Sequence, residues 1–101
     1  MKNWHKIGSV DEYKNDNKWI VKINNKPIAL FKYKDNYYAL KNGCMHQGFP
    51  LADGNLSEYM VECPLHGWVY DIRDGKCLSL GDRYTIKYEL RIKKNNIEIK
   101  L

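Results

Sequence analysis

The sequence predicts an all-β fold for this chain of 101 residues. Two observations carry the prediction. Apolar and polar residues alternate over short segments, and clusters of Asn, Asp, Gly and Pro separate those segments. No repeat, linker or low-complexity stretch divides the chain, and its length suits one domain with a modest core. We therefore expect a single domain over residues 1–101.

The first half of the chain contains the clearest strand signals. The spacing of Ser9 and Glu12 matches a capping box and predicts one helical turn. Three alternating segments follow, with turns expected at Asn24–Pro27 and Lys34–Asn36, and the first two should form a hairpin. The expected strands are Lys18–Ile23, Ile28–Tyr33 and Tyr37–Leu40.

The second half of the sequence indicates shorter strands around a central loop, followed by a final hairpin. Ile86–Ile92 alternates so that Ile86, Tyr88, Leu90 and Ile92 should form one apolar face. A turn at Lys93–Asn96 should lead to the last strand. The expected strands here are Tyr59–Glu62, Trp68–Ile72, Ile86–Ile92 and Ile97–Lys100.

Two short motifs carry the chemistry: Cys44-Met45-His46, and Cys63-Pro64-Leu65-His66 after it. Each supplies one thiolate and one imidazole beside a turn marked by Gly or Pro. Two Cys and two His form the ligand set of a Rieske [2Fe–2S] centre, in which one iron binds two Cys and the other two His. The same four side chains could also form a closed tetrahedral zinc site. Zinc fingers usually pair like ligands locally, however, so the alternating order favours iron and sulfide.

The sequence around the ligands resembles Rieske ferredoxins. The similar stretches are Cys-Met-His-Gln-Gly-Phe-Pro-Leu at 44–51 and Val-Glu-Cys-Pro-Leu-His-Gly-Trp-Val-Tyr-Asp at 61–71. The resemblance implies the Rieske fold, an antiparallel β-sandwich base with a small inserted cluster-binding subdomain. The base would comprise residues 1–43 and 83–101, and the subdomain about 44–82. One [2Fe–2S] cluster per chain would be held by Cys44, His46, Cys63 and His66.

The resemblance also implies roles for residues around the ligands. High-potential relatives carry an inter-loop disulfide at the positions of Phe49 and Leu65, which cannot form one here, so packing of Phe49, Pro50, Leu51 and Leu65 should hold the loops. Trp68 stands where those relatives have a serine that donates to a bridging sulfide, and we expect it to pack against a ligand loop. Two readings of Tyr70 stay open, a donor near the cluster and a core aromatic. Gly48 and Gly67 either bring backbone N–H groups near the sulfurs or are ordinary turn glycines.

Composition narrows the possible partners and the compartment. The net charge is +5, but residues 44–82 carry six acids against two basic residues, so the basic charge belongs to the expected base. Its Lys residues are spread singly along alternating strands, which argues against nucleic acid as a partner. No signal-like segment or membrane-spanning run is present. Cys77 is left over as an odd thiol, expected to be buried on a strand after a turn at Asp74–Lys76, and an unpaired thiol suits a reducing cytoplasm.

These features predict a soluble one-electron carrier and not an enzyme. A Rieske ferredoxin would take electrons from a reductase and pass them to a terminal oxygenase or a similar oxidoreductase, without a membrane partner. Two alternatives remain. One is the small subunit of an assimilatory nitrite reductase, which shares the fold, and the other is a zinc-stabilised interaction module.

Overall fold

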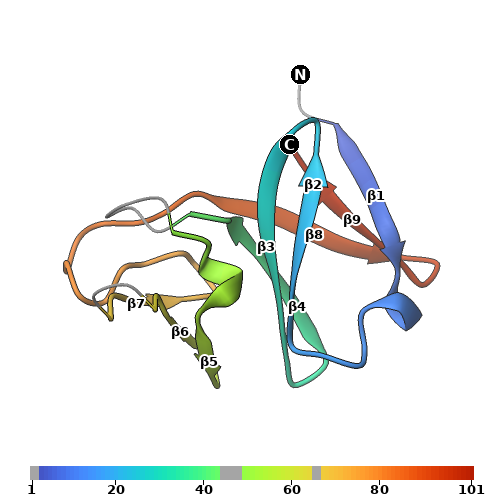
Figure 1. Ribbon diagram of the computed structural model, residues 1–101. Coiled ribbons are helices and arrows are strands. Elements are labelled where there is room, and N and C mark those ends of the chain that lie inside the picture. The colour runs from blue at the N-terminus through green and yellow to red at the C-terminus, as the bar shows by residue number, and fades with distance from the viewer. Residues whose placement is uncertain (1–2, 44–48, 65–66) are drawn as a thin grey trace.

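The computed structural model describes residues 3–43, 49–64 and 67–101. Within these ranges the protein is all-β, as expected, with two antiparallel sheets and two single turns of 3-10 helix. The larger sheet has six strands in the order β1-β9-β8-β4-β3-β2, and the smaller has the order β5-β6-β7. Figure 1 shows the two sheets at opposite ends of the molecule.

The elements follow one another along the chain in this order: β1 (Trp4–Ser9), η1 (Val10–Glu12), β2 (Lys18–Ile23), β3 (Lys26–Tyr33), β4 (Asn36–Lys41), η2 (Leu51–Asp53), β5 (Asn55–Ser57), β6 (Met60–Glu62), β7 (Val69–Asp71), β8 (Lys87–Lys93) and β9 (Asn96–Lys100). The described residues from 49 to 82, with η2 and the smaller sheet, are called the small lobe below. The six-stranded sheet is called the base. The boundaries 44 and 82 of a separate subdomain stay a prediction.

Three hairpins of the base have two-residue loops with positive φ at both positions. The loops are Asn24-Asn25, Lys34-Asp35 and Lys94-Asn95. A loop of this kind twists in the same sense as its strands, and Asn and Asp tolerate positive φ better than most residues. The turns are therefore tighter than expected, and β3 begins at Lys26, with Pro27 inside the strand.

Strand β3 connects the base core with the small lobe. Its run Ile28–Phe31 is buried throughout, because the strand is covered on both faces. Ile28 and Leu30 pack into apolar clusters of the base, whereas Ala29 and Phe31 pack into a cluster shared with the small lobe. The small lobe is thus seated on the outer face of β3 and β4 through apolar packing.

Several expectations need correction. Strands β1 and β5 and helix η2 have no counterpart in the sequence prediction. The predicted apolar face of 86–92 is only half correct, because Ile86 is 52% and Ile92 49% exposed, while Tyr88 and Leu90 pack against base clusters. These two isoleucines lie just before β8 and near its end, where neighbouring residues no longer cover them.

Other local predictions are confirmed. The single helical turn at η1 has its capping contact, since the Ser9 N–H donates to Oε2 of Glu12 at 2.7 Å. Cys77 is fully buried with an unpaired thiol, although it lies in an isolated bridge to Tyr70 and not in a regular strand. Among the described residues, no helix is long and apolar enough to cross a membrane.

Candidate metal centre

Only part of the predicted ligand set lies within the described residues. Cys63 does, and its side chain is fully buried. Cys44, His46 and His66 lie outside the described residues, as do Gly48 and Leu65 of the surrounding set. The described residues that flank these positions show how the two ligand segments are supported.

The first ligand segment leaves β4 and returns through η2. The buried side-chain oxygen of Asn42, just after β4, accepts a hydrogen bond of 2.9 Å from the N–H of Ala52 in η2. The Asn42 N–H donates in turn to the Pro27 carbonyl at 3.1 Å. The chain between residues 42 and 52, which contains Cys44 and His46, is therefore closed at its base and anchored to β3.

The second ligand segment is the tip of the hairpin formed by β6 and β7. Glu62 pairs with Val69, and the Cys63 N–H donates to the Trp68 carbonyl at 2.7 Å. Gly67 has φ +68°, in the left-handed region where a side chain is strained. The hydrogen bond between Cys63 and Trp68 fixes the backbone at Cys63. The positive φ at position 67 explains why that residue is a glycine.

The two segments emerge side by side. Strand β5, which follows the first segment, pairs with β6, which precedes the second, and Asn55 lies opposite Glu62. Gly54 approaches the β6 backbone so closely that a Cβ there would lie 2.4 Å from the Glu62 carbonyl oxygen. This close approach places the end of the first ligand segment beside the start of the second.

One apolar cluster packs beneath both segments. It includes Leu51 and Cys63, with Phe49 and Trp68 packed against it. Phe49, Leu51 and Trp68 thus share one apolar cluster, whereas the expectation that this packing holds the ligand loops in place of a disulfide stays a prediction. Pro50 is half-buried and is the N-cap of η2, where its carbonyl accepts the Asp53 N–H at 3.1 Å.

Tyr70 is fully buried in the same cluster, opposite Val61 and bridged to Cys77. Its position supports the reading as a core aromatic. A hydrogen bond from its hydroxyl toward a cluster sulfur stays a prediction.

An aromatic and ionic network joins the small lobe to the base. Arg73 donates to both carboxylate oxygens of Asp71, at 3.0 and 2.8 Å, and its guanidinium lies 4.1 Å from the centre of the Tyr59 ring. Tyr59 in turn makes edge contacts with Tyr33 of β3 and Tyr38 of β4. Sequence reasoning missed this network, because its members are separate in the chain and meet only once the lobe is seated.

The Asp71 carboxyl is tuned by this network. Its pKa lies below the ordinary range, first because the Arg73 side chain donates hydrogen bonds to it. The pKa of Tyr38 lies above its ordinary value, mainly because burial disfavours the phenolate. Asp71 is therefore ionised and Tyr38 neutral near pH 7.

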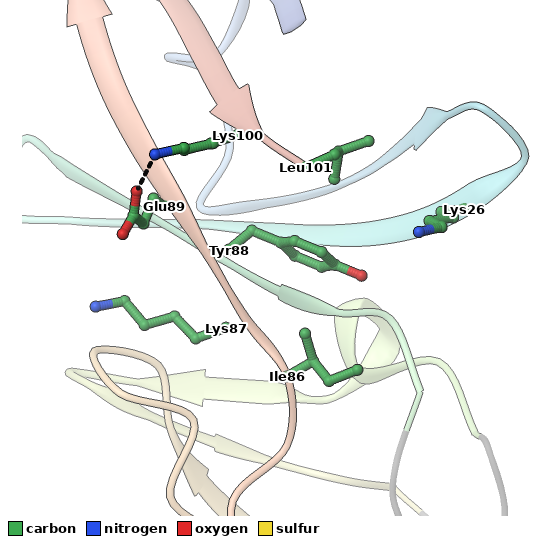
Figure 2. Close-up of a pocket in the computed structure, with 7 residues that line it drawn as sticks. All are labelled: Lys26, Ile86, Lys87, Tyr88, Glu89, Lys100 and Leu101. Carbon is green, nitrogen blue, oxygen red and sulfur yellow. Dashed lines mark ion pairs between the residues drawn. The ribbon is translucent and has the colours of Figure 1, made fainter. Parts of the chain in front are cut away.

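The base has a hollow of its own, apart from the ligand segments. It has a volume of about 370 Å³, and Figure 2 shows the ion pair of 3.6 Å between Lys100 and Glu89 at its edge. The lining contains no Cys or His, so the hollow offers no ligand of the predicted type. The lining residues are Lys26, Ile86, Lys87, Tyr88, Glu89, Lys100 and Leu101.

Comparison with known proteins decides the family. The model of the Rieske [2Fe-2S] domain matches residues 3–88. The chain belongs to the Rieske [2Fe–2S] family. This assignment favours the iron–sulfur reading of the ligand quartet over the zinc reading.

The similar proteins include electron carriers of nearly the same length. The anthranilate 1,2-dioxygenase ferredoxin subunit of Burkholderia cepacia is 33% identical over 98% of this chain and 93% of its own. The ferredoxin component of naphthalene 1,2-dioxygenase/salicylate 5-hydroxylase systems of a Ralstonia species is 32% identical, with 98% and 96% covered. Among solved structures, the ferredoxin of carbazole 1,9a-dioxygenase from Nocardioides aromaticivorans IC177 superposes with a TM-score of 0.85 over 96% of both chains. At 21% identity, this superposition supports the Rieske fold alone.

The described residues fit a Rieske [2Fe–2S] cluster. Cys63 offers a buried sulfur on a hairpin whose backbone is fixed on both sides of the tip. The adjoining apolar side chains keep water from this sulfur, as the apolar shell of a metal site does, and iron would hold the sulfur as a thiolate.

Proposed function

We propose that this Rieske protein is a ferredoxin, a soluble cytoplasmic carrier that takes one electron from a reductase and passes it to a terminal oxygenase. The observation that carries the proposal is the similarity over nearly the full length to ferredoxin components of dioxygenase systems. The same relatives favour this function over that of a nitrite reductase small subunit. The chain itself would catalyse no reaction of the substrate.

Four residues would hold the cluster: Cys44, His46, Cys63 and His66. When bound, the cluster supplies a centre that accepts and releases one electron, at a potential raised by the two neutral imidazoles. The protein's own part is to hold the ligand segments still. The Asn42–Ala52 and Cys63–Trp68 hydrogen bonds close the two segments, so little rearrangement of the backbone should accompany a change of charge.

The apolar residues beneath the ligands would keep water from the inner side of the cluster. Phe49, Leu51 and Trp68 pack on that side, and Tyr70 fills the core below them. Gly48 and Gly67 would let backbone N–H groups approach the sulfurs closely, and Leu65 would help to hold the loops by packing. The compartment assignment is supported by the unpaired buried thiol of Cys77, which suits a reducing environment.

The decisive experiment is analysis of the purified protein for iron, acid-labile sulfide and zinc. We expect two irons and two sulfides per chain and a red-brown colour, because all four ligands of a Rieske centre are present. Cys63→Ser should abolish the cluster, whereas Cys77→Ser should leave its visible spectrum unchanged. One zinc per chain without sulfide, or loss of the cluster in Cys77→Ser, would overturn the ligand assignment.

A second experiment tests the role as carrier. The reduced protein is mixed with the oxygenase encoded nearest to its gene, and reoxidation of the cluster is followed by absorbance. Rapid reoxidation is expected. Electron transfer to a neighbouring siroheme subunit and not to an oxygenase would favour the nitrite reductase reading instead.

A further inference from the structure

The hollow of the base has the size of a small-molecule site. Its volume of about 370 Å³ lies within the range of about 300–1,000 Å³ that is usual for such sites. It is found where β3 begins and β9 ends, next to the segment that leads from the small lobe into β8. None of the described residues that line it belongs to the two ligand segments, so it is a separate feature of the fold.

The apolar walls of the hollow rest on fixed parts of the base. Tyr88 and Leu101 pack against the core cluster that contains Ile28 and Ile99. The third apolar lining residue, Ile86, is 52% exposed, so a ligand would cover aliphatic surface that water now contacts. The carbonyl of this residue accepts the Lys41 N–H at 2.9 Å, which fixes its backbone. A ligand would therefore meet a preformed surface and would order little of the protein on binding.

Basic groups outnumber acids around the hollow. Lys26, Lys87 and Lys100 line it, and Glu89 is the acidic side chain among them. The carboxylate of Glu89 is engaged by Lys100 in the ion pair of 3.6 Å. Basic groups stay in excess even if a terminal carboxyl group at Leu101 is counted. The lining therefore favours a ligand of negative charge over a cation.

One end of the hollow combines an ammonium group with a hydroxyl group. Figure 2 shows the Tyr88 hydroxyl pointing toward the side on which Lys26 lies, whereas the amines of Lys87 and Lys100 lie on the opposite side. Burial raises the pKa of Tyr88 above its ordinary value, so the hydroxyl keeps its proton near pH 7. It is then available to donate a hydrogen bond to an anionic oxygen that also faces the Lys26 ammonium.

We propose that the hollow of the base binds a small aromatic monocarboxylate, with its carboxylate between Lys26 and the Tyr88 hydroxyl and its ring on the apolar lining residues. A carboxylate has two acceptor oxygens, so each of the two donors has a partner. An aromatic ring covers Ile86 and Leu101 with a rigid body, which loses less conformational freedom on binding than a flexible chain does. The inference does not depend on the role as electron carrier, because none of the residues involved is a predicted cluster ligand.

Benzoate is a suitable probe, and two molecules that each keep part of it are the controls. Benzamide keeps the ring without the charge, and acetate keeps the charge without the ring. Each is titrated at pH 7 and low salt into the purified protein as isolated, and the backbone amide signals of the lining residues are followed by NMR. We expect benzoate to bind with a dissociation constant on the order of 1 mM, because so small a ligand makes few contacts. Benzamide and acetate should bind about tenfold more weakly.

Two matched pairs of variants test the contacts. Lys26→Gln should weaken benzoate binding about fivefold by removing the ammonium, whereas Lys94→Gln removes an exposed lysine outside the lining and should leave binding unchanged. Ile86→Gln should also weaken binding about fivefold by replacing the apolar wall. Its control is Ile92→Gln, because Ile92 is 49% exposed and does not line the hollow.

Several results would overturn the proposal. One is benzoate binding that leaves the amide signals of Lys26, Lys87 and Leu101 unmoved, and another is no binding at all at concentrations far above 1 mM. Benzamide binding as tightly as benzoate would show that the charge plays no part, and acetate binding as tightly would show the same for the ring. Equal affinities in Lys26→Gln and Lys94→Gln would mean that benzoate responds to net charge and not to this site. Equal affinities in the two isoleucine variants would rule out the apolar contact with Ile86.

Discussion

The side chain of Asn42 and the backbone of Ala52 are joined by a buried hydrogen bond across the base of the first ligand segment. The donor is the Ala52 N–H, and its distance to Oδ1 of Asn42 is 2.9 Å. Asn42 stands at the end of β4 and Ala52 lies in η2, which packs on the cluster shared with β3. One side chain thus connects the base sheet to the segment that carries Cys44 and His46.

Asn42→Ala should destabilise the fold and speed loss of the cluster. The substitution leaves the buried Ala52 N–H without its acceptor, which costs about 1–3 kcal/mol. Chemical denaturation of the protein and the rate of bleaching by an iron chelator would measure the two effects. Asn36→Ala is a suitable control, because the Asn36 side chain makes an exposed contact of 3.2 Å to the Lys34 carbonyl. Equal bleaching rates in the two variants would contradict the role given to Asn42.

Gly67→Ala should disturb the second ligand hairpin more than an equivalent change elsewhere. Gly67 has φ +68°, where an L-residue costs about 1–2 kcal/mol, and a Cβ there would lie 3.3 Å from Oε2 of Glu62. Gly81 has a similar φ of +79° but nothing within 4 Å of an added Cβ. We expect both variants to lose stability, measured by thermal unfolding, and only Gly67→Ala to change the cluster spectrum. A spectral change in Gly81→Ala alone would be inconsistent with this assignment.

Much of the base could be predicted because its strands alternate regularly and its turns contain Asn and Asp. Strand β2 was predicted with the bounds that the structure gives. β1 escaped prediction because its register shifts between Lys6 and Gly8, where a bulge interrupts the alternation. β5 is only three residues long, too short for any pattern to emerge.

The chemistry of the site could be predicted better than its supports. The ligands are revealed by residue type and spacing, as Cys63 illustrates, since a Cys-x-x-His motif is visible in one short stretch. The hydrogen bond from the Ala52 N–H to Asn42 has no sequence motif. A polar residue before a loop is usually exposed to solvent, so the sequence does not show that the Asn42 side chain is buried and bonded. The stacking of Arg73 on Tyr59 is likewise a product of the folded lobe.

Stability should fall in acid partly through Asp71. Its folded-state pKa is lowered first by the hydrogen bond from the Arg73 side chain, so the folded protein binds this proton less readily than the unfolded chain does. The stabilisation is complete above the unfolded pKa of about 3.9 and is lost as the pH falls through the lower folded pKa. Unfolding by denaturant at several pH values between 7 and 2 would show a difference between wild type and Asp71→Asn that shrinks in acid.

Arg73→Gln provides the control for that pH dependence. It removes the donor that lowers the Asp71 pKa while leaving the carboxyl in place. The variant should approach Asp71→Asn in stability at pH 7 and lose less stability than the wild type between pH 5 and pH 2. A wild-type pH dependence in Arg73→Gln would show that another group is responsible.

The cluster potential should lie near the low end of the Rieske range, about −150 mV. The position of Trp68 would hold a serine hydroxyl in high-potential relatives, and an indole ring packed against the core replaces that donor here. A hydrogen bond to sulfur stabilises the more negative reduced cluster, so its absence lowers the potential. Protein-film voltammetry at pH 7 gives the value directly. A midpoint well above zero would mean that donors other than this hydroxyl compensate.

Glu62 should lower the potential further. Its carboxylate reaches toward Gly67 at the hairpin tip, and no ion pair to it is found among residues 3–43, 49–64 and 67–101. In a medium as polar as water, two unit charges about 10 Å apart interact by about 0.4 kcal/mol, or about 20 mV for one electron. Glu62→Gln should therefore raise the midpoint by about 20 mV at low salt, and less as salt screens the exposed charge. Glu58→Gln is the control, because it removes the same charge just before the other end of β6. A midpoint shift as large as that of Glu62→Gln would show that the net charge, and not the position of Glu62, sets the potential.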